Sequence, residues 1–250
     1  MSEPIILAID TSSKVTSLAV AQGERLLGSS GELHDEQRSE TLWCDVQSLL
    51  ERLGKTISDV ALFGVCTGPG GFTGLRVGIS AAKGFSAATN KPIVGVTSLE
   101  AAALSAEAPG LISVLVNAYK GEVYSQLFSL YGDRLPEKKN EPMVSSYQQA
   151  LERVLDAGEL ILAGDALEPK MKIIEDFISE HKKEKWVVRI PNQSLAVAIA
   201  KIAYMKSRRQ EFDNAATLRA CYVRPSEAEI KLSLGLLGSK IKRSMRPEQG

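Results

Sequence analysis

The residues best suited to chemistry lie in the run from Gly68 to Gly78. The run reads Gly-Pro-Gly-Gly-Phe-Thr-Gly-Leu-Arg-Val-Gly, between an apolar segment and a small-residue segment. Glycines at a strand-to-helix turn adopt positive φ and leave backbone N–H groups open to an anion. Gly74, Gly78 and Ala82 also recur every four residues, which would let another helix approach closely. We expect an anion-binding turn, a close helix contact, or a tight turn without a ligand.

Two common phosphate-binding patterns do not fit this run. A P-loop needs a glycine, four residues and then Gly-Lys-Ser/Thr, and no lysine follows a glycine in that frame. The dinucleotide pattern G-x-G-x-x-G fails because Thr73 stands at its third glycine position. The run is therefore neither of these two phosphate loops.

The glycine run closely resembles the signature of the bacterial TsaB family, whose members help to make threonylcarbamoyladenosine in tRNA. Three further stretches resemble that family in the same order: Ile-Asp-Thr-Ser-Ser at 9–13, Gly-Glu-Val-Tyr at 121–124 and Tyr-Val-Arg-Pro-Ser-Glu-Ala-Glu at 222–229. The resemblance covers about residues 4–232, and the glycine run is its specific part.

This resemblance implies a duplicated actin-like ATPase fold (ASKHA, RNase H-like) with two α/β subdomains. It also implies a non-catalytic scaffold that activates a TsaD-type subunit, which modifies N6 of the adenosine 3′-adjacent to the tRNA anticodon. A TsaE-type ATPase would dock on the pair. The chain would hold no cofactor of its own, with ATP or ADP at a partner interface left open. Family homodimers use the partner surface, so a homodimer also stays open.

Two sets of residues carry these expectations. A nucleotide, anion or junction loop is expected at Asp10, Thr11, Ser12, Gly68, Gly70, Gly71, Thr73 and Arg76. A partner interface on two helices is expected at Leu42, Trp43, Val46, Gly74, Gly78 and Ala82. The alternative for the second set is that both helix faces simply cover the sheet.

The alternative function is an actin-like ATPase or small-molecule kinase that uses Asp10 and the glycine run. In such kinases an Asp at the end of the first strand helps to hold metal and nucleotide. Asn117 stands where many TsaB relatives carry Asp, and an uncharged amide argues against a kinase-type site. Arg38 replaces a family His, which weakens a catalytic role there. A third option is a stand-alone homodimer in another pathway.

We expect no metal site and no catalytic nucleophile. The TsaD-type relative holds metal through His-x-x-x-His, whereas this chain has only His34 and His181. Ser12, Ser13 and Thr73 lack an identifiable His partner. The accessory role, rather than an enzyme, follows from the resemblance and from these observations.

Composition describes an ordinary globular protein, with 44% hydrophobic and 24% charged residues. No apolar run approaches the roughly 20 residues of a membrane span. Cys44, Cys66 and Cys221 are widely spaced, which argues against a disulfide framework. We therefore expect a cytoplasmic protein that does not contact membranes.

Charge is unevenly distributed along the chain. Residues 201–250 carry 11 Lys/Arg and 5 Asp/Glu, or +6, so the first 200 residues carry −6 because the total is zero. This basic end would meet an acidic partner, make indirect or weak contact with tRNA, or remain a solvated tail.

Alternating strand and helix patterns predict an α/β fold in two halves. In the first half (1–108), we expect strands at 5–9, 15–21, 25–30, 60–66 and 93–96, and helices at 39–53, 75–88 and from Ser98. In the second half (109–232), we expect strands at 111–117, 123–131, 135–144, 160–163 and 186–190, and helices at 147–156, 167–181 and 194–208. Residues 233–250 are expected to form a basic mobile tail, with a short helix expected near 230–237.

Overall fold

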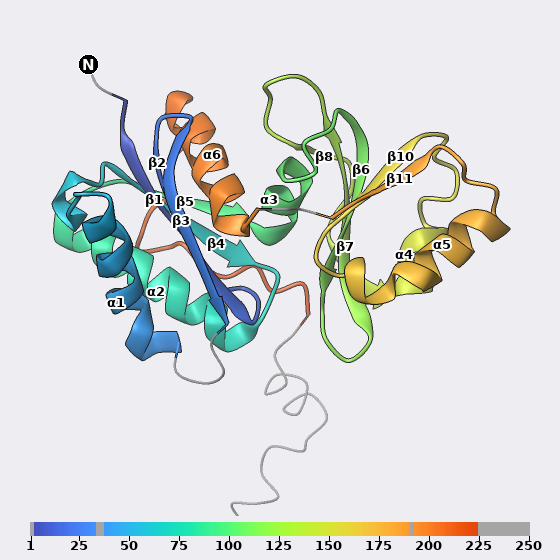
Figure 1. Cartoon of the computed structure of the whole chain (residues 1–250), viewed down its shortest axis with the longest axis horizontal. Helices are drawn as coiled ribbons and strands as arrows, with labels where there is room; N and C mark the ends of the chain where they lie inside the picture. Colours follow the sequence, from blue (N-terminus) through green and yellow to red (C-terminus); the bar gives the residue numbers. More distant parts are fainter. Residues whose placement is uncertain (1–2, 34–37, 191–192, 225–250) are drawn as a thin grey trace, which may run out of the picture.

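A computed structural model describes residues 3–33, 38–190 and 193–224, and it shows two α/β lobes side by side (Figure 1). The first lobe is built on a five-stranded sheet with the order β3-β2-β1-β4-β5. Its strands are β1 (Ile5–Asp10), β2 (Val15–Gln22), β3 (Arg25–Leu33), β4 (Leu62–Gly68) and β5 (Ile93–Thr97). Strand β1 pairs antiparallel with β2 and parallel with β4, which pairs parallel with β5.

The second lobe is built on a sheet with the order β11-β10-β6-β7-β8, and β9 also pairs with β7. Its strands are β6 (Gly110–Asn117), β7 (Glu122–Leu130), β8 (Glu137–Lys138), β9 (Met143–Ser146), β10 (Leu160–Ala163) and β11 (Trp186–Arg189). Strands β6, β10 and β11 run parallel, whereas β7 is antiparallel to β6.

Helices cover both faces of the first sheet. Those of the first lobe are α1 (Arg38–Arg52), α2 (Phe72–Thr89), α3 (Ser98–Leu104) and α6 (Leu195–Arg208), with a short 3₁₀ turn η1 (Ile57–Asp59). The second lobe has α4 (Tyr147–Glu152), α5 (Met171–Glu180) and the 3₁₀ turn η2 (Glu168–Lys170). Helices α1 and α2 lie on one face, and α6 with α3 lies on the other (Figure 1). Helix α3 also contacts β6 and β7, so it joins the two lobes.

Hydrophobic spacing explains helix α1. Leu42, Val46, Leu49 and Leu50 recur at helical spacing and are all buried against the first sheet. The helix ends where Gly54 takes φ +63° and donates its N–H to the Glu51 carbonyl. The pattern in the sequence therefore places this helix correctly.

Helix α6 returns from the second half of the sequence to the first sheet. Ile199 and Ala203 pack against Gly64 of β4, where an added Cβ would lie 3.2 and 3.1 Å from them. Residues 209–224 then run along β5 toward the second lobe. The predicted division at 108/109 stays a prediction, although α6 lies spatially with the first sheet.

Most expected elements are confirmed. Helix α4 ends at Glu152 instead of at 156, and three further elements differ. Helix α2 starts at Phe72 rather than at 75, because Gly71 is extended and serves as its N-cap. The expected strand 135–144 is wrong. The segment forms two short strands, β8 and β9. Between them, the Leu127 N–H donates to Asn140 Oδ1 and not to a backbone carbonyl, which interrupts the strand pairing. The expected helix 167–181 is divided into η2 and α5.

Several expectations lie outside the described residues. These are the helix near 230–237, the tail 233–250 and the loop around His34. Among the described residues, no helix is both long and apolar enough to cross a bilayer. Cys44, Cys66 and Cys221 form no disulfide in the structure.

Candidate functional site: the cleft between the lobes

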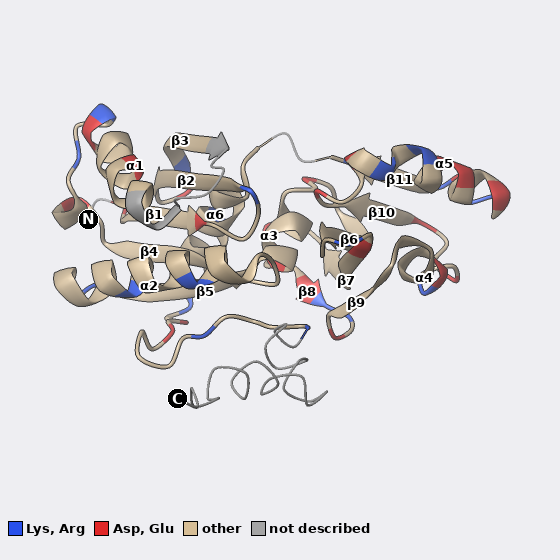
Figure 2. Ribbon diagram, turned by 90° about the horizontal axis from the view of Figure 1, so that it is seen from below, with Lys and Arg blue, Asp and Glu red and all other residues tan. Residues whose placement is uncertain are grey.

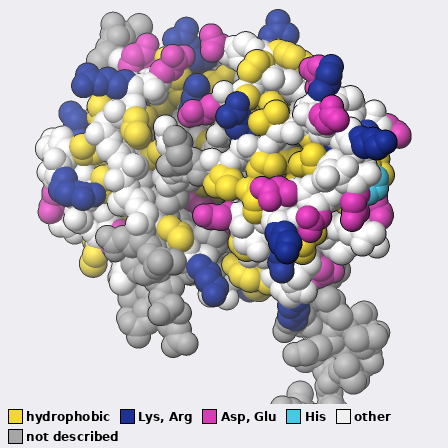
Figure 3. Space-filling view, turned by 45° about the vertical axis from the view of Figure 1, so that its right-hand side comes forward, with side chains coloured by type: hydrophobic (Ala, Val, Ile, Leu, Met, Phe, Trp, Pro, Cys, Tyr) yellow, Lys and Arg dark blue, Asp and Glu magenta, His cyan; other side chains and the backbone are white. Residues whose placement is uncertain are grey.

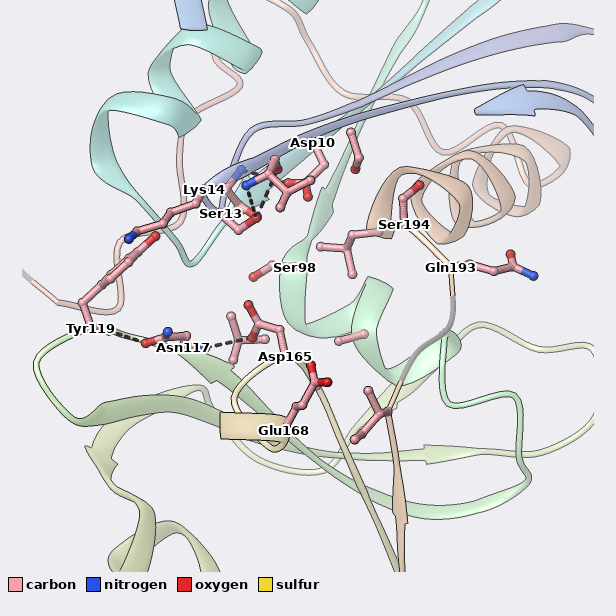
Figure 4. A pocket seen from close by; sticks show the side chains of 18 residues that line it. Asp10, Ser13, Lys14, Ser98, Asn117, Tyr119, Asp165, Glu168, Gln193 and Ser194 are labelled. Atoms are coloured by element: carbon pink, nitrogen blue, oxygen red, sulfur yellow. Dashed lines mark hydrogen bonds between the residues drawn. The ribbon is translucent and has the colours of Figure 1, made fainter. Parts of the chain in front are cut away.

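The two lobes enclose a cavity of about 510 Å³ (Figure 4). Strands β1 and β6 end on its wall, at Asp10 and Asn117, and β10 is followed there by Gly164. The carboxyl ends of parallel strands are the usual place for ligands in α/β folds. Further lining residues are Ser12, Ser13, Lys14, Val15, Ser17, Ser98, Ala102, Val116, Tyr119, Asp165, Glu168, Ile190, Gln193, Ser194 and Leu195.

Asp10 is buried at the end of β1 and is held by the turn that follows. The Ser12 N–H donates to Asp10 Oδ1 at 2.9 Å, and the Gly71 N–H donates to the Ser12 carbonyl at 2.6 Å. An Asp that bonds the backbone two residues later forms a compact local turn. The structure thus connects the predicted residues Asp10 and Ser12 to Gly71 of the glycine run.

Asp165 stands on the second-lobe wall of the cleft. The Asn117 N–H donates to its Oδ1 at 3.0 Å, so the carboxylate links the ends of β6 and β10. Enclosure in the cleft raises the pKa of Asp165, and the charge of Asp10 raises it further, against the lowering effect of the Asn117 N–H. Asp165 remains open to the cavity, which makes it accessible to a ligand.

The lining charges do not fit a bare polyphosphate. Asp10, Asp165 and Glu168 are carboxylates, and Lys14 is the only lysine or arginine among the lining residues that the structure describes. A nucleotide polyphosphate would therefore face net negative charge unless a cation neutralised it. Among the described residues, no group of three or more His, Cys, Asp or Glu is arranged to hold a metal ion. That the chain holds no cofactor of its own stays a prediction.

Cys66 lies beneath the cleft in strand β4. Burial raises the pKa of its thiol well above the ordinary value, and the nearby charge of Asp10 acts in the same direction. A protonated, fully buried thiol is a poor nucleophile. The geometry gives Cys66 a packing role.

The glycines of the run allow close approach to the hairpin between β1 and β2. A Cβ at Gly70 would overlap the Ser12 backbone, and a Cβ at Gly78 would overlap Thr11 Oγ1. Gly68 takes φ +97° where β4 ends. The glycine types at these positions therefore have a packing cause, independent of any anion.

Arg76 belongs to the glycine run but is not among the residues that line the cleft. Its guanidinium sits over the Phe72 ring, 3.9 Å from the centroid, and its Nε donates to Tyr222 Oη at 3.3 Å. Phe72 and Tyr222 stack with centroids 5.0 Å apart. Thr73 is exposed on the first turn of α2. The predicted loop residues are thus divided between the cleft and the amino end of α2.

The small-residue face of α2 is closed by the chain's own sheet. Gly74, Gly78 and Ala82 are buried, and Thr11 Oγ1 donates to the Gly74 carbonyl at 2.7 Å. Of the two alternatives for this face, contact with another helix or cover for the chain's own sheet, the burial of these residues favours the second. Leu42 and Val46 are also buried, so Trp43, 49% exposed, is the residue of the predicted interface set that presents its side chain outward.

Sequence reasoning missed Asp165, Glu168, Lys14 and Tyr119 as cleft residues. The pair Gly164-Asp165 directly after the buried strand at 160–163 was the signal that could have found Asp165. His181 is not among the residues that line the cleft; it caps the carboxyl end of α5, where its ring stacks on Phe177 with centroids 4.1 Å apart.

Solved structures of other proteins share the fold of this chain. A Pseudomonas aeruginosa protein described as similar to the peptidase YEAZ superposes with a TM-score of 0.71 at 24% identity, covering 88% of this chain and all of that one. The ROK hexokinase of Thermus thermophilus superposes with a TM-score of 0.51 at 12% identity, covering 82% and 99%. The chain has the duplicated actin-like α/β fold.

Sequence comparison identifies the family. The family model described as TsaD, tRNA N6-adenosine threonylcarbamoyltransferase, matches residues 29–225. The tRNA threonylcarbamoyladenosine biosynthesis protein TsaB of Bacillus subtilis is 33% identical over 124 residues, which cover 49% of this chain and 54% of that protein. The chain belongs to the family this model describes, and to its TsaB branch. It spans about half the length of the curated relatives it matches.

Proposed function

We propose that this chain takes part in forming threonylcarbamoyladenosine in tRNA, as a non-catalytic scaffold that binds and activates a TsaD-type transferase. Its membership of the TsaB branch supports the pathway. In this proposal the partner performs the transfer to N6 of the adenosine 3′-adjacent to the anticodon, and this chain holds the partner in its active form.

The outer face of α1 and α2 carries the proposal. Trp43 is half exposed on α1 and lies on Phe85 of α2, with ring centroids 5.5 Å apart. Phe85 in turn lies 5.9 Å from the buried ring of Phe63 on β4. Because this row of rings ties Trp43 to the core, the exposed indole is held in place before a partner arrives, which lowers the entropic cost of binding.

A cavity of about 180 Å³ lies beside Trp43. Its apolar wall is formed by Trp43, Val46, Leu50 and Ile57, and Glu51 and Lys55 stand among its polar lining residues. A rigid exposed tryptophan next to a small apolar cavity is typical of the anchor residues of protein interfaces. We propose that the TsaD-type partner inserts an apolar side chain here.

Reconstitution tests this function. Threonylcarbamoyladenosine formation on unmodified tRNA would be measured with TsaD-type and TsaE-type subunits and the threonylcarbamoyl adenylate, with and without this chain. Product that depends on the chain, with none from the chain alone, supports the scaffold. Equal product without the chain refutes it.

Trp43→Ala tests the proposed face. We expect binding to the TsaD-type subunit to weaken by at least about 2 kcal/mol, or roughly thirtyfold, as for an interface anchor. Tyr131→Ala is the matched control, because Tyr131 is 60% exposed just beyond β7 in the second lobe. Equal affinity of wild type and Trp43→Ala, measured by calorimetry, would place the partner elsewhere.

A second candidate is an actin-like ATPase or small-molecule kinase. The cavity of about 510 Å³ with Asp10 on its wall favours it, whereas the further lining carboxylates, Asp165 and Glu168, oppose the binding of a polyphosphate. ATP turnover by the isolated chain, lost in Asp10→Asn, would favour this alternative. The Asn side chain keeps an oxygen for the Ser12 N–H, so the variant removes charge without removing that hydrogen bond.

Further parts of the proposal concern partners. A TsaE-type ATPase would dock on the pair, ATP or ADP would bind at the partner interface, and a homodimer would use the α1–α2 face in competition with TsaD. Contact with tRNA would be weak or indirect. On the face shown in Figure 3, hydrophobic side chains lie among charges of both signs, an arrangement that suits a protein partner better than a polyanion.

A further inference from the structure

The segment 209–224, here called the strap, runs from the end of α6 along β5 to the junction of the lobes (Figures 1 and 2). The Asp213 N–H donates to the Ile93 carbonyl at 2.9 Å, and the Gly95 N–H donates to Asp213 Oδ2 at 2.7 Å. Leu218 is buried with the first-lobe core. The strap therefore covers the outer edge of β5 and is anchored to the first lobe.

Further along, the strap is fixed to the glycine run. The Cys221 N–H donates to the Thr67 carbonyl at 2.7 Å. Tyr222 then stacks on Phe72 and accepts a hydrogen bond from Arg76. These contacts hold the strap against the amino end of α2.

The last described residues cross to the second lobe. Val223 packs against the core cluster formed by α3, β6 and β7. Arg224 forms an ion pair with Glu122, the first residue of β7, and the two side chains are only 28% and 37% exposed. A partly buried ion pair is screened less than a fully exposed one. The strap thus bonds to both lobes.

Glu122 belongs to the turn that forms the mouth of the cleft. The Ala118 N–H donates to the Glu122 carbonyl at 3.0 Å, and the Glu122 N–H donates to the Tyr119 carbonyl at 3.1 Å. Tyr119 lines the cleft, and its side chain lies near that of Lys14 from the opposite lobe (Figure 4). A Cβ on Gly71 would lie 3.8 Å from Tyr119 Oη, so the turn reaches the glycine run.

We propose that the strap is an interlobe clasp that sets the width of the cleft mouth. The Arg224–Glu122 pair draws the turn 117–122 toward the amino end of α2, where Tyr222 holds the strap. Breaking the pair lets the second-lobe wall move away from the hairpin between β1 and β2. The clasp is a property of the chain itself and does not depend on which partner or ligand it binds.

Hydrogen exchange of the full chain tests the clasp. In Arg224→Gln, amides of the turn 117–122 and of the opposite wall 10–17 should exchange about two- to fivefold faster, the range expected for loss of one ion pair. The charge swap Glu122→Arg with Arg224→Glu should return the rates toward wild type. Lys185→Gln is the control, because it removes the exposed Lys185–Glu159 pair of the second lobe, 2.8 Å long and remote from the strap.

The exchange rates of the three variants distinguish a clasp from a local effect of the substitution. Faster exchange on both walls, recovered by the swap and absent in Lys185→Gln, supports the clasp. Faster exchange confined to residues 222–224, no recovery in the swap, or an equal effect of Lys185→Gln overturns it. An interlobe distance measured between labels at Glu24 and Glu152, both exposed, provides the second readout, and an unchanged distance in Arg224→Gln also overturns the proposal.

Discussion

Gly78→Ala tests the packing of the glycine run against the first strand. Gly78 is buried in α2, and an added Cβ would overlap Thr11 Oγ1. That hydroxyl donates to the Gly74 carbonyl at 2.7 Å, so the methyl group would displace a buried hydrogen bond. The substitution therefore disturbs one defined contact, that between residue 78 and the Thr11 hydroxyl.

The expected loss of stability follows from three contributions. Overpacking a filled site costs about 1–3 kcal/mol. Losing the Thr11–Gly74 hydrogen bond costs about 0.5–1.5 kcal/mol, and the higher helix propensity of Ala offsets about 1 kcal/mol. We expect the free energy of unfolding to fall by about 2 kcal/mol, or about 4–8 °C in melting temperature for a chain of this size.

Urea unfolding followed by circular dichroism measures this change. Gly84→Ala is the matched control in the same helix, because a Cβ at Gly84 would meet no atom within 4 Å. That variant should gain about 0.5–1 kcal/mol from helix propensity alone. Replacing glycine by alanine is thus expected to lower the free energy of unfolding at position 78 and to raise it at position 84 of the same helix.

The double variant Thr11→Ala/Gly78→Ala removes the obstructing hydroxyl. It should be more stable than the sum of the two single changes predicts, by about 1 kcal/mol or more. A Gly78→Ala protein as stable as wild type, or strictly additive changes, would show that Thr11 and Gly78 do not touch and would refute this account of the glycine run.

Three further predictions concern the strap, the lobe junction and the cleft. Leu218→Ala should cost about 2–3 kcal/mol in urea unfolding because it leaves a cavity over β5, whereas Leu26→Ala, at a 41% exposed side chain, should cost less than about 0.5 kcal/mol; equal losses would contradict burial of the strap. Burial raises the pKa of Glu100, but Lys206, the Thr97 N–H and Lys138 together lower it below 4.5, so its ionised form stabilises the fold at neutral pH and this contribution is lost as pH falls. Glu100→Gln should therefore be less stable than wild type at pH 7, and the two unfolding free energies should converge near about pH 3. Enclosure and the charge of Asp10 raise the pKa of Asp165 above 3.8. The contribution of its protonated form to the free energy of unfolding is therefore full at low pH and is lost as pH rises. Asp165→Asn should gain stability relative to wild type as pH rises from about 4 to 7, and a constant difference would count against the raised pKa.

The first lobe was predictable because its signals are local. Strand β1 is a continuous apolar run, and α1 has a single apolar face that ends at Gly54. Each pattern is complete within about fifteen residues, so it needs no knowledge of distant contacts. The same holds for β10, a short buried strand between turns.

The errors occurred where distant contacts override local preference. The segment 135–144 was expected to form one strand, but Asn140 accepts hydrogen bonds from the Gln126 side chain and the Leu127 N–H of β7, which interrupts the pairing. For the small-residue face of α2 the sequence left two alternatives open, a partner contact or cover for the sheet, because it does not show that Thr11 lies against this face. Spacing along a helix identifies a face without identifying what covers it.

The sequence by itself determined the fold class, the order of elements and the family, because periodicity and the glycine run are contained in the chain order. Only the tertiary structure decided the site. Asp10 and Asp165 are 155 positions apart, yet both line one cavity because β1 of the first sheet and β10 of the second sheet end at the same cleft. Likewise, Arg224 meets Glu122 only because the strap crosses from one lobe to the other, which depends on the packing of both lobes.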